Sequence, residues 1–585
     1  MEFRVSIAQI NPKSGDIKGN SRLILQGIDQ AREQAADLVV FPEMCLTGYC
    51  LDEKLLFNRT FLRDNKRILL EEIVPACKGI AAIIGFVDFE EEGSGPDSGP
   101  IRYNAAMVVD DRRVSDIVHK RLLPSYRYFD DKRYFKAGSR VEPILLGPGG
   151  KVRIGVLICE DLWDEKYDFK PAGVYAEKGV DYLFCINASP FVCSSPGLED
   201  GKRFQRSLLI RSHVEAYGVP IVSVNTVGIG DNGKNIIPFD GFSSAHDRRG
   251  QQVACLASFA PDQQTVTFNG GVASPVEVPV FEREQEIYDA LVMGVRDYYD
   301  KTAAFTGVLE AVSGGIDSAL GAAIACDAMG AERVSLYNLP SKFNSETTQT
   351  AAAQLARNFG TEYHVVPIQD LVDQAVRDFE SHLHPMRSHL TLENLQARIR
   401  GVIMMAESND REALLLTNGN ETEIALGYAT LYGDMVGGLA VIGDLPKPDV
   451  YRVSRYVNRR WGREMIPRAI FEIPASAELS EGQVDPFDYS VVGPMVSDFI
   501  EKNISPEVLA DQFERRELNL NKYEATEAGD LYTRYDRASF LELARKTYRT
   551  MTYSAYKRVQ AAPIIVVSER AFGFDLRETI INGWR

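Results

Sequence analysis

The sequence lacks the features that define several classes of protein. No two of its eight cysteines have the Cys-x-x-Cys spacing, and they are spread through 585 residues, so neither a zinc knuckle nor a disulfide framework is indicated. Basic residues are not in excess, because the net charge is -17, which argues against a nucleic-acid groove as the main function. We therefore expect no nucleic-acid partner, although an acidic protein can still hold a local basic pocket for phosphates.

Long apolar runs are also missing. The longest weakly charged stretch, 425–443, has Asp434 near its middle and five glycines, and an aspartate at the centre of a membrane helix costs about 2.5 to 3.5 kcal/mol. The first residues, Met-Glu-Phe-Arg-Val, do not form the cationic segment and apolar run of a secretory signal. We expect a cytoplasmic protein without a membrane partner, in which 425–443 is a packed, glycine-rich site segment.

The chain does have the length of a protein with two large domains, at roughly 100 to 200 residues per domain or more for α/β units. Strands dominate the pattern of the first half, whereas helices and strands alternate regularly in the second half. The connector 272–281 has two prolines and no helical period, which indicates an extended segment. The predicted domains are 1–272 and 285–585, with a linker at 273–284. The alternation in the second half predicts a doubly wound parallel sheet.

One glycine-rich segment, Ser313-Gly-Gly-Ile-Asp-Ser318, lies between a predicted strand at 308–312 and a predicted helix at 318–329. The carboxyl end of a strand is where α/β sheets bind ligands, and adjacent glycines with a helix N-terminus form a cradle for phosphate. The segment resembles the loop of the ATP pyrophosphatase superfamily, which splits ATP into AMP and pyrophosphate. That resemblance implies an adenine nucleotide α-hydrolase-like fold, in which Asp317 holds Mg²⁺ and the other loop residues bind ATP, namely Ser313, Gly314, Gly315 and Ser318. A glycine turn of purely structural use is the alternative.

A second glycine-rich segment, Gly228-Ile-Gly-Asp-Asn-Gly-Lys234, follows a predicted strand and matches Gly-x-Gly-x-x-Gly. The next residues include Pro238 and cannot open the helix that a nucleotide-binding loop requires. We interpret this segment as a loop between two strands.

Three strand-end residues in the first half suit amide hydrolysis through a thioester. Glu43 ends Val-Val-Phe-Pro-Glu, Lys120 lies in His-Lys-Arg-Leu-Leu-Pro, and Cys159 ends Gly-Val-Leu-Ile-Cys. A carboxylate can take the thiol proton, an ammonium can stabilise an oxyanion, and the sulfur can attack a carbonyl carbon. Each residue alone at a strand end is more often structural, and it is the combination of the three in their sequence contexts that carries a family resemblance.

This triad, with Leu46-Thr-Gly-Tyr49 and Asn187-Ala-Ser189, resembles the nitrilase superfamily over residues 1–272. The resemblance implies a four-layer α-β-β-α sandwich with catalytic Glu43, Lys120 and Cys159. In the members that hydrolyse glutamine, it further implies substrate contacts from Tyr49, Tyr126, Glu160 and Ser189, with Glu160 at the α-amino group. Segment 194–206 is a candidate for the carboxylate contact.

Several segments of the second half resemble NAD synthetases, among them 417–434, Leu339-Pro-Ser-Lys-Phe, Glu393-Asn-Leu-Gln-Ala-Arg, Pro474-Ala-Ser-Ala-Glu-Leu and Tyr556-Lys-Arg-Val-Gln. Together with the nitrilase-like first half, the whole chain resembles the glutamine-dependent branch of that family. The resemblance implies that Glu423 joins Asp317 at Mg²⁺ and that Thr417 and Asn418 bind ATP. It also implies a deamido-NAD site made by Asn394, Glu423, Asp434, Lys447, Ser476 and Lys557. For Asp434 and Lys447, a surface ion pair or a helix cap is the structural alternative.

One motif departs from the family pattern. The usual Thr-Thr-Gly-Asn-Lys-Ser-Glu is here Thr417-Asn-Gly-Asn-Glu-Thr-Glu423, so that a hydroxyl becomes the amide of Asn418 and a lysine becomes Glu421. The ATP contact of Asn418 is the one that this change affects, whereas Glu423 is retained.

The expected activity is the ATP- and Mg²⁺-dependent amidation of deamido-NAD⁺ to NAD⁺, with ammonia taken from glutamine or from solution, by a homo-oligomer. Two alternatives remain at this stage. One is another glutamine amidotransferase of the same ATP superfamily, and the other is a non-catalytic nucleotide sensor on a decayed scaffold. Glu at position 2 excludes an N-terminal cysteine nucleophile, and the presence of the triad with Asp317 and Glu423 argues against decay.

Overall fold

The computed structural model describes residues 2–49, 51–91, 99–147, 151–523 and 530–581. They form two compact units, one made of Met1–Val192, Asp200–Asn232 and Ile237–Val280, and the other of Cys193–Glu199, Gly233–Ile236 and Phe281–Arg585. Among the described helices, none is both long enough and apolar enough to cross a membrane.

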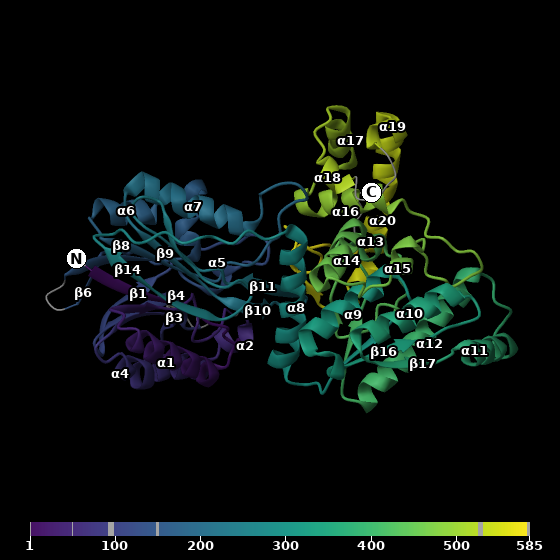
Figure 1. The fold of residues 1–585 in the computed structure, drawn as a ribbon, viewed down its shortest axis with the longest axis horizontal. Coiled ribbons are helices and arrows are strands. Elements are labelled where there is room, and N and C mark those ends of the chain that lie inside the picture. The colour runs from purple at the N-terminus through teal and green to yellow at the C-terminus, as the bar shows by residue number, and fades with distance from the viewer. Residues whose placement is uncertain (1, 50, 92–98, 148–150, 524–529, 582–585) are drawn as a thin grey trace. The chain divides into compact units, whose positions relative to one another are not determined.

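Two six-stranded sheets form the centre of the first unit (Figure 1). The first sheet has the order β14 (Asp262–Asn269), β1 (Glu2–Gln9), β2 (Leu38–Val40), β3 (Ala81–Glu90), β4 (Ile101–Asp110) and β5 (Arg113–His119). The second has the order β13 (Gln252–Cys255), β12 (Ser244–His246), β9 (Ile221–Asn225), β8 (Tyr182–Asn187), β7 (Val152–Ile158) and β6 (Ile144–Leu146).

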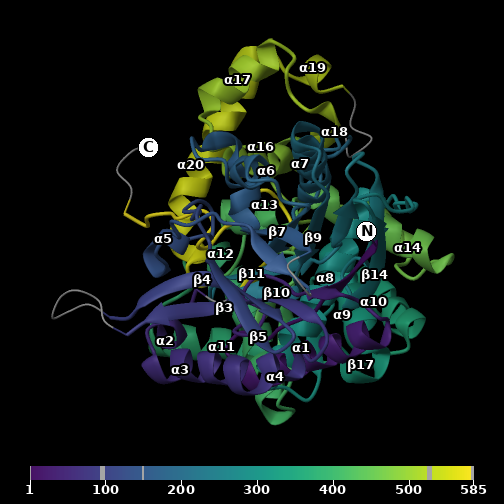
Figure 2. The ribbon, with the colours of Figure 1, turned by 90° about the vertical axis from the view of Figure 1, so that its left-hand side faces the viewer.

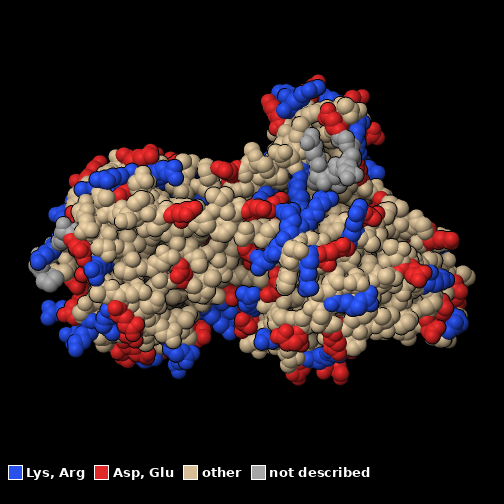
Figure 3. Space-filling view, viewed as in Figure 1, with Lys and Arg blue, Asp and Glu red and all other residues tan. Residues whose placement is uncertain are grey.

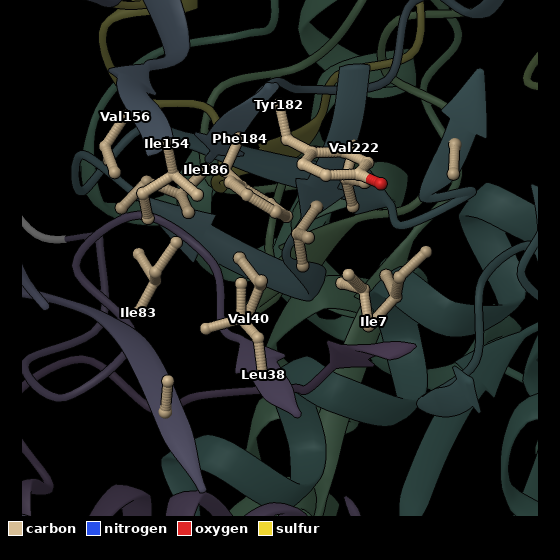
Figure 4. Packing of buried hydrophobic residues seen from close by; sticks show 14 of the residues in the cluster. Ile7, Leu38, Val40, Ile83, Ile154, Val156, Tyr182, Phe184, Ile186 and Val222 are labelled. Atoms are coloured by element: carbon tan, nitrogen blue, oxygen red, sulfur yellow. The ribbon is translucent and has the colours of Figure 1, made fainter. Parts of the chain in front are cut away.

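The two sheets pack face to face through a core of buried aliphatic and aromatic side chains. Ile7, Leu38, Val40 and Ile83 of the first sheet point toward Ile154, Phe184, Ile186 and Val222 of the second (Figure 4). Side chains alternate between the faces of a strand, so the intervening residues of β7 and β8, such as Leu157 and Leu183, face the opposite way and pack on helices. Both faces of these strands are therefore apolar, as expected for parallel strands covered on both sides.

Helices cover the outer face of each sheet (Figure 2). On one side lie α1 (Ile17–Glu33), α3 (Arg59–Ile68), a π-helical turn (Leu69–Ile73) and α4 (Val74–Ala76), and on the other α6 (Pro171–Glu177) and α7 (Lys202–Tyr217). In α1 the Asp16 carboxylate accepts a hydrogen bond from Gly19 N, and Ile17, Ile24 and Ile28 are buried at helical spacing. The first unit is thus the predicted α-β-β-α sandwich. Short helices α2 (Glu53–Leu56) and α5 (Asp131–Tyr134) complete it.

The second unit is built on a parallel sheet with the order β20 (Ile564–Ile565), β19 (Leu439–Ala440), β18 (Leu414–Thr417), β15 (Val308–Ala311), β16 (Val334–Asn338) and β17 (Glu362–Val365). From β15 the chain first builds toward β17 and then returns to add β18 on the other side. The order of strands therefore reverses between β15 and β18, and ligands bind in such a crevice at the carboxyl ends of the strands.

Long helices pack on this sheet: α8 (Arg283–Thr302), α9 (Ile316–Met329), α10 (Glu346–Phe359), α11 (Gln369–His382), α12 (His389–Asp410) and α14 (Lys447–Trp461). The remaining helices are α13 (Glu421–Leu426), α15 (Arg468–Glu472), α16 (Tyr489–Lys502), α17 (Pro506–Glu514), α18 (Leu520–Tyr523), α19 (Leu531–Arg534) and α20 (Arg537–Arg558). The doubly wound fold predicted for the second half is confirmed.

The two units are not continuous in sequence, which the residue pattern did not indicate. In the second unit, Asn235 at the start of β11 (Asn235–Asp240) pairs in parallel with Ile564, and Cys193 N donates to Val567 O. The segment 228–234 also differs from the predicted loop, because its first residues lie in β10 (Val227–Asp231).

Candidate active sites

Glu43 and Lys120 form a buried ion pair in the first unit. Their side chains are almost fully enclosed, and Lys120 Nζ lies 2.8 Å from Glu43 Oε1. Glu43 also accepts hydrogen bonds from Asn104 Nδ2 at 2.7 Å and from Ala188 N at 2.7 Å. Every oxygen of the carboxylate is thus oriented, as a positioned general base requires.

Cys159 directly follows β7 and begins a short 3-10 turn, Cys159–Leu162. Its φ is +47°, a left-handed conformation that is strained for a residue with a Cβ and is often found at functional sites. Burial and the charge of Glu43 raise the pKa of the Cys159 thiol, whereas the charge of Lys120 lowers it, and the pKa stays well above its usual value. The thiol is therefore neutral in this state and needs a base to become a nucleophile.

Asp131 was not predicted from the sequence. It is fully buried at the start of α5, where it accepts hydrogen bonds from Lys120 Nζ at 2.7 Å and from the Tyr49 hydroxyl at 2.8 Å. Burial would lower the pKa of Lys120, but the carboxylates of Asp131 and Glu43 raise it well above its usual value. The ammonium is consequently held as a cation. The hydroxyl of Tyr49, a predicted substrate contact, is held by this carboxylate.

Glu160 follows the cysteine and is clamped by two tyrosines. The hydroxyls of Tyr126 and Tyr167 each donate to one Glu160 oxygen at 2.9 Å. Burial raises the pKa of the Glu160 carboxyl and these hydrogen bonds oppose the rise. The structure therefore brings together Tyr126 and Glu160, two of the predicted substrate contacts. Tyr167, which was not predicted, belongs to the same hydrogen-bonded group.

Ser189 and Arg206 are in contact, and Ser189 follows Ala188, whose N–H donates to Glu43. The Ser189 hydroxyl is buried and has no hydrogen-bond partner among the described residues, so it can pair with a substrate atom. Arg206, in the segment suggested for a substrate carboxylate, donates to Ser189 O at 3.2 Å and forms an ion pair with Asp240. Its charge is thus already paired within the protein.

In the second unit, Ser313–Ser318 connects β15 to α9 as predicted. The Ser313 hydroxyl accepts from Gly315 N at 3.2 Å and lies 3.4 Å from the Ser318 hydroxyl. Gly314 has a φ of +90°, and a Cβ there would lie 2.1 Å from Thr348 O, so only glycine fits. The loop precedes the N-terminus of α9, whose dipole favours a bound anion.

Asp317, Glu423 and Lys447 converge from three helices. Lys447 Nζ lies 2.5 Å from Asp317 Oδ2 and 3.3 Å from Glu423 Oε1. Asn420 fixes both carboxylates, because its amide donates to Asp317 Oδ1 at 2.9 Å and it caps α13 together with Glu423. Burial raises the pKa of Glu423 to about 8, against the opposing effect of Lys447.

Thr417 ends β18 and Asn418 follows it, on the other side of the switch point. The Thr417 hydroxyl donates to Asp434 O at 2.9 Å, and Asn418 Nδ2 donates to Ala311 O at 3.2 Å. Asp434 Oδ1 accepts from Thr430 N at 2.6 Å, while the Thr430 hydroxyl donates to Asn394 at 2.7 Å. Asp434 therefore fixes a turn through its hydrogen bond with Thr430 N and is also a candidate contact.

A cavity of about 860 Å³ joins most of these residues within the second unit. Predicted site residues that line it are Ser313, Gly315, Asp317, Ser318, Thr417, Asn418, Glu423, Asp434, Lys447 and Ser476. Three predicted site residues, Gly314, Asn394 and Lys557, are not among the lining residues: Gly314 packs on α10, and Lys557 Nζ donates to Gly427 O and Ala429 O.

Arg400 and Glu478 line the same cavity and were not singled out from the sequence. Burial lowers the pKa of Arg400 to about 10, and its guanidinium donates to Leu339 O and Asn344 Oδ1. Glu478 accepts from Thr348 Oγ1 at 2.9 Å and from Asn344 Nδ2 at 3.0 Å. Arg400 lies just after Glu393-Asn-Leu-Gln-Ala-Arg, and that motif was the sequence signal that could have pointed to it.

On the surface, acidic and basic side chains are interspersed over the face shown in Figure 3.

Comparisons with known proteins cover the whole chain. Residues 4–269 match the carbon-nitrogen hydrolase family model and residues 287–534 match the NAD synthase model. The glutamine-dependent NAD(+) synthetase of Thermotoga maritima is 33% identical over 100% of this chain and 99% of its own, and the Rhodobacter capsulatus protein of that name is 35% identical over the same shares.

Solved structures agree with these matches. A glutamine-dependent NAD+ synthetase from Acinetobacter baumannii, in complex with ADP, is 32% identical and superposes with a TM-score of 0.73 over 100% of this chain and 99% of that chain. The fold is also shared with a Cytophaga hutchinsonii structure at a TM-score of 0.80 and 20% identity, which covers 100% of this chain and 98% of that chain.

Proposed function

Because the chain belongs to the glutamine-dependent NAD⁺ synthetase family, we propose that it makes NAD⁺ from deamido-NAD⁺, ATP and ammonia released from glutamine. Residues 1–272 are assigned to the amidase and 285–585 to the synthetase, with 273–284 as the linker. Full-length relatives of this one activity support it over another amidotransferase of the ATP superfamily. The oriented Glu43, Lys120 and Cys159 argue against a nucleotide sensor.

In the amidase, Cys159 is the nucleophile. Glu43 takes the thiol proton, and the sulfur attacks the amide carbon of glutamine. The Lys120 ammonium stabilises the oxyanion and is kept charged by Glu43 and Asp131. The proton held by Glu43 passes to the leaving nitrogen, ammonia departs, and water then cleaves the thioester to give glutamate. Glu160 binds the α-ammonium group of the substrate, with Tyr126 and Ser189 beside it.

In the synthetase, Ser313–Ser318 binds the pyrophosphate portion of ATP while the nicotinate carboxylate of deamido-NAD attacks the α-phosphate. The products are the mixed anhydride with AMP and free pyrophosphate. Ammonia then attacks the activated carbonyl carbon, and AMP leaves. Lys447 neutralises negative charge beside the loop, and the cavity volume of about 860 Å³ suits two nucleotides lying together.

Asp317 and Glu423 are the residues that would hold Mg²⁺. Their carboxylate oxygens are hard ligands, and both already bracket a positive charge, that of Lys447. When bound, the ion offsets the charge of the pyrophosphate group. A homo-oligomer and a cytoplasmic location also belong to this proposal, on the strength of the family and its substrates.

The observation that carries the proposal is that the first unit pairs Glu43 with Lys120 beside Cys159, while the second brings Asp317, Glu423 and Lys447 together at the predicted ATP loop. The test is to incubate the purified protein with ATP, Mg²⁺, deamido-NAD⁺ and glutamine, and to separate NAD⁺ and AMP by chromatography. Equal amounts of NAD⁺ and AMP are expected. Glutamate release without NAD⁺ would refute the synthetase assignment.

A further inference from the structure

Glu310 is a glutamate in the middle of a sheet. It lies on β15, paired with Leu336 of β16 and Leu416 of β18, and its side chain is completely buried. Neither of its carboxylate oxygens has a hydrogen-bond partner in the described part of the chain. None of the roles assigned above uses it.

Asn418 borders the same small gap. Its Nδ2 donates to Ala311 O, but its Oδ1 is buried and likewise lacks a partner among the described residues. A Cβ on Gly321 of α9 would lie 2.4 Å from Asn418 Oδ1 and 2.4 Å from Glu310 Oε1. The absent side chain of Gly321 thus leaves room for two buried oxygens that have no hydrogen-bond partner among the described residues.

Two buried acceptors beside the same gap can both be satisfied by one proton shared between them. A buried carboxylate without a partner is strongly disfavoured, whereas a neutral carboxylic acid has one O–H donor. We propose that Glu310 is a neutral acid that donates its O–H to Asn418 Oδ1 and so positions the Asn418 amide at the ATP loop. That ATP is the ligand of this loop rests on the proposed function.

The electrostatics agree with this pair. Burial is the larger influence and raises the pKa of Glu310 well above its usual value; an amide N–H of Asn418 donated to a carboxylate would lower it, and the rise holds against that influence. Another titratable group nearby is the Cys326 thiol of α9, whose own pKa is raised by burial. No charged group of α9, β16 or β18 acts on the pKa of Glu310.

The pair also accounts for the altered family motif. The usual threonine at position 418 has one hydroxyl, which can turn to suit a single partner. The asparagine here has a donor and an acceptor at fixed positions, and the acceptor points into the sheet, where Glu310 supplies the proton. Glu310 is therefore a positioning residue that acts through Asn418.

Two replacements of Glu310 separate positioning from packing. Glu310→Gln keeps an N–H donor for Asn418 Oδ1, and the apparent KM for ATP in ammonia-supported synthesis should stay within about twofold of the wild type. Glu310→Leu leaves that oxygen unpaired, and the KM should rise roughly tenfold with little change in kcat. Asn418→Thr added to Glu310→Leu should restore much of the loss, since neither unpaired oxygen remains. Glutamine hydrolysis measured on the same preparations controls for folding.

The protonation state can be observed without turnover. The infrared difference spectrum of wild type minus Glu310→Gln, at mildly alkaline pH, should contain the carbonyl stretch of a protonated carboxylic acid. A carboxylate band in its place, or a Glu310→Leu enzyme with the wild-type KM, would overturn the proposal. If the wild type made no NAD⁺, the proposed function would fail, while the infrared band and ATP affinity from calorimetry would still decide the pair.

Discussion

Replacing Lys120 by methionine removes the single ammonium between Glu43 and Asp131. Lys120 is 1% exposed and lies 2.8 and 2.7 Å from the two carboxylates, so the variant leaves both acids buried without their cation. Breaking a buried ion pair in this way costs about 3 to 5 kcal/mol. For a unit of this size, that corresponds to a fall of roughly 6 to 20 °C in the unfolding midpoint.

Cys159→Ala is the matched control, because it also abolishes glutamine hydrolysis but removes a neutral thiol. It should cost about 1 kcal/mol, as for the loss of one small apolar group. Calorimetric scans of both variants, with glutamine- and ammonia-supported NAD⁺ formation, give the comparison.

The folded-state pKa of Lys120 lies above its unfolded value of about 10.4. The contribution of Lys120 to the free energy of unfolding is therefore complete below that pH and is lost only as the pH rises through the folded value. The deficit should therefore be the same at neutral and mildly alkaline pH, and equal midpoints for the two variants would refute the reasoning.

Four further predictions separate the two units. Cys159→Ala should lower glutamine-supported synthesis by several orders of magnitude and leave ammonia-supported synthesis intact; surviving glutamine activity would contradict the nucleophile assignment. Asp317→Asn should nearly abolish synthesis with either nitrogen source in a folded protein, measured as NAD⁺ formed, and wild-type rates with ammonia would contradict the metal assignment. Glu160→Gln should raise the KM for glutamine roughly 10- to 100-fold without affecting ammonia, and an unchanged KM would argue against contact with the α-ammonium group. Gly314→Ala should weaken ATP binding while glutaminase activity persists, since its Cβ would meet Thr348 O at 2.1 Å; calorimetry showing normal ATP affinity would contradict this.

The sequence by itself determined the local chemistry of both sites. Ser313–Ser318 could be recognised because its function depends on a strand, a glycine turn and a helix that are neighbours in the chain. Glu43, Lys120 and Cys159 could each be placed at strand ends by short apolar runs. Their assembly into one site depended on family resemblance, because they are far apart in sequence. The catalytic and binding roles of these residues remain predictions that the variants above test.

Only the tertiary structure decided which residues that are distant in sequence form ion pairs or share a proton. Asp131 is an acidic residue with no distinctive local pattern, and its contact with Lys120 joins the first residue of α5 to the residue that follows β5. Lys447 is placed between Asp317 and Glu423 by three helices, α9, α13 and α14, which follow the carboxyl ends of β15, β18 and β19. Glu310 and Asn418 meet only because β15 and β18 are neighbours in the parallel sheet and Gly321 leaves a gap. Side-chain pairing of this kind follows from strand order and helix packing, which are long-range properties of the folded chain, so no local pattern of residues could have revealed it.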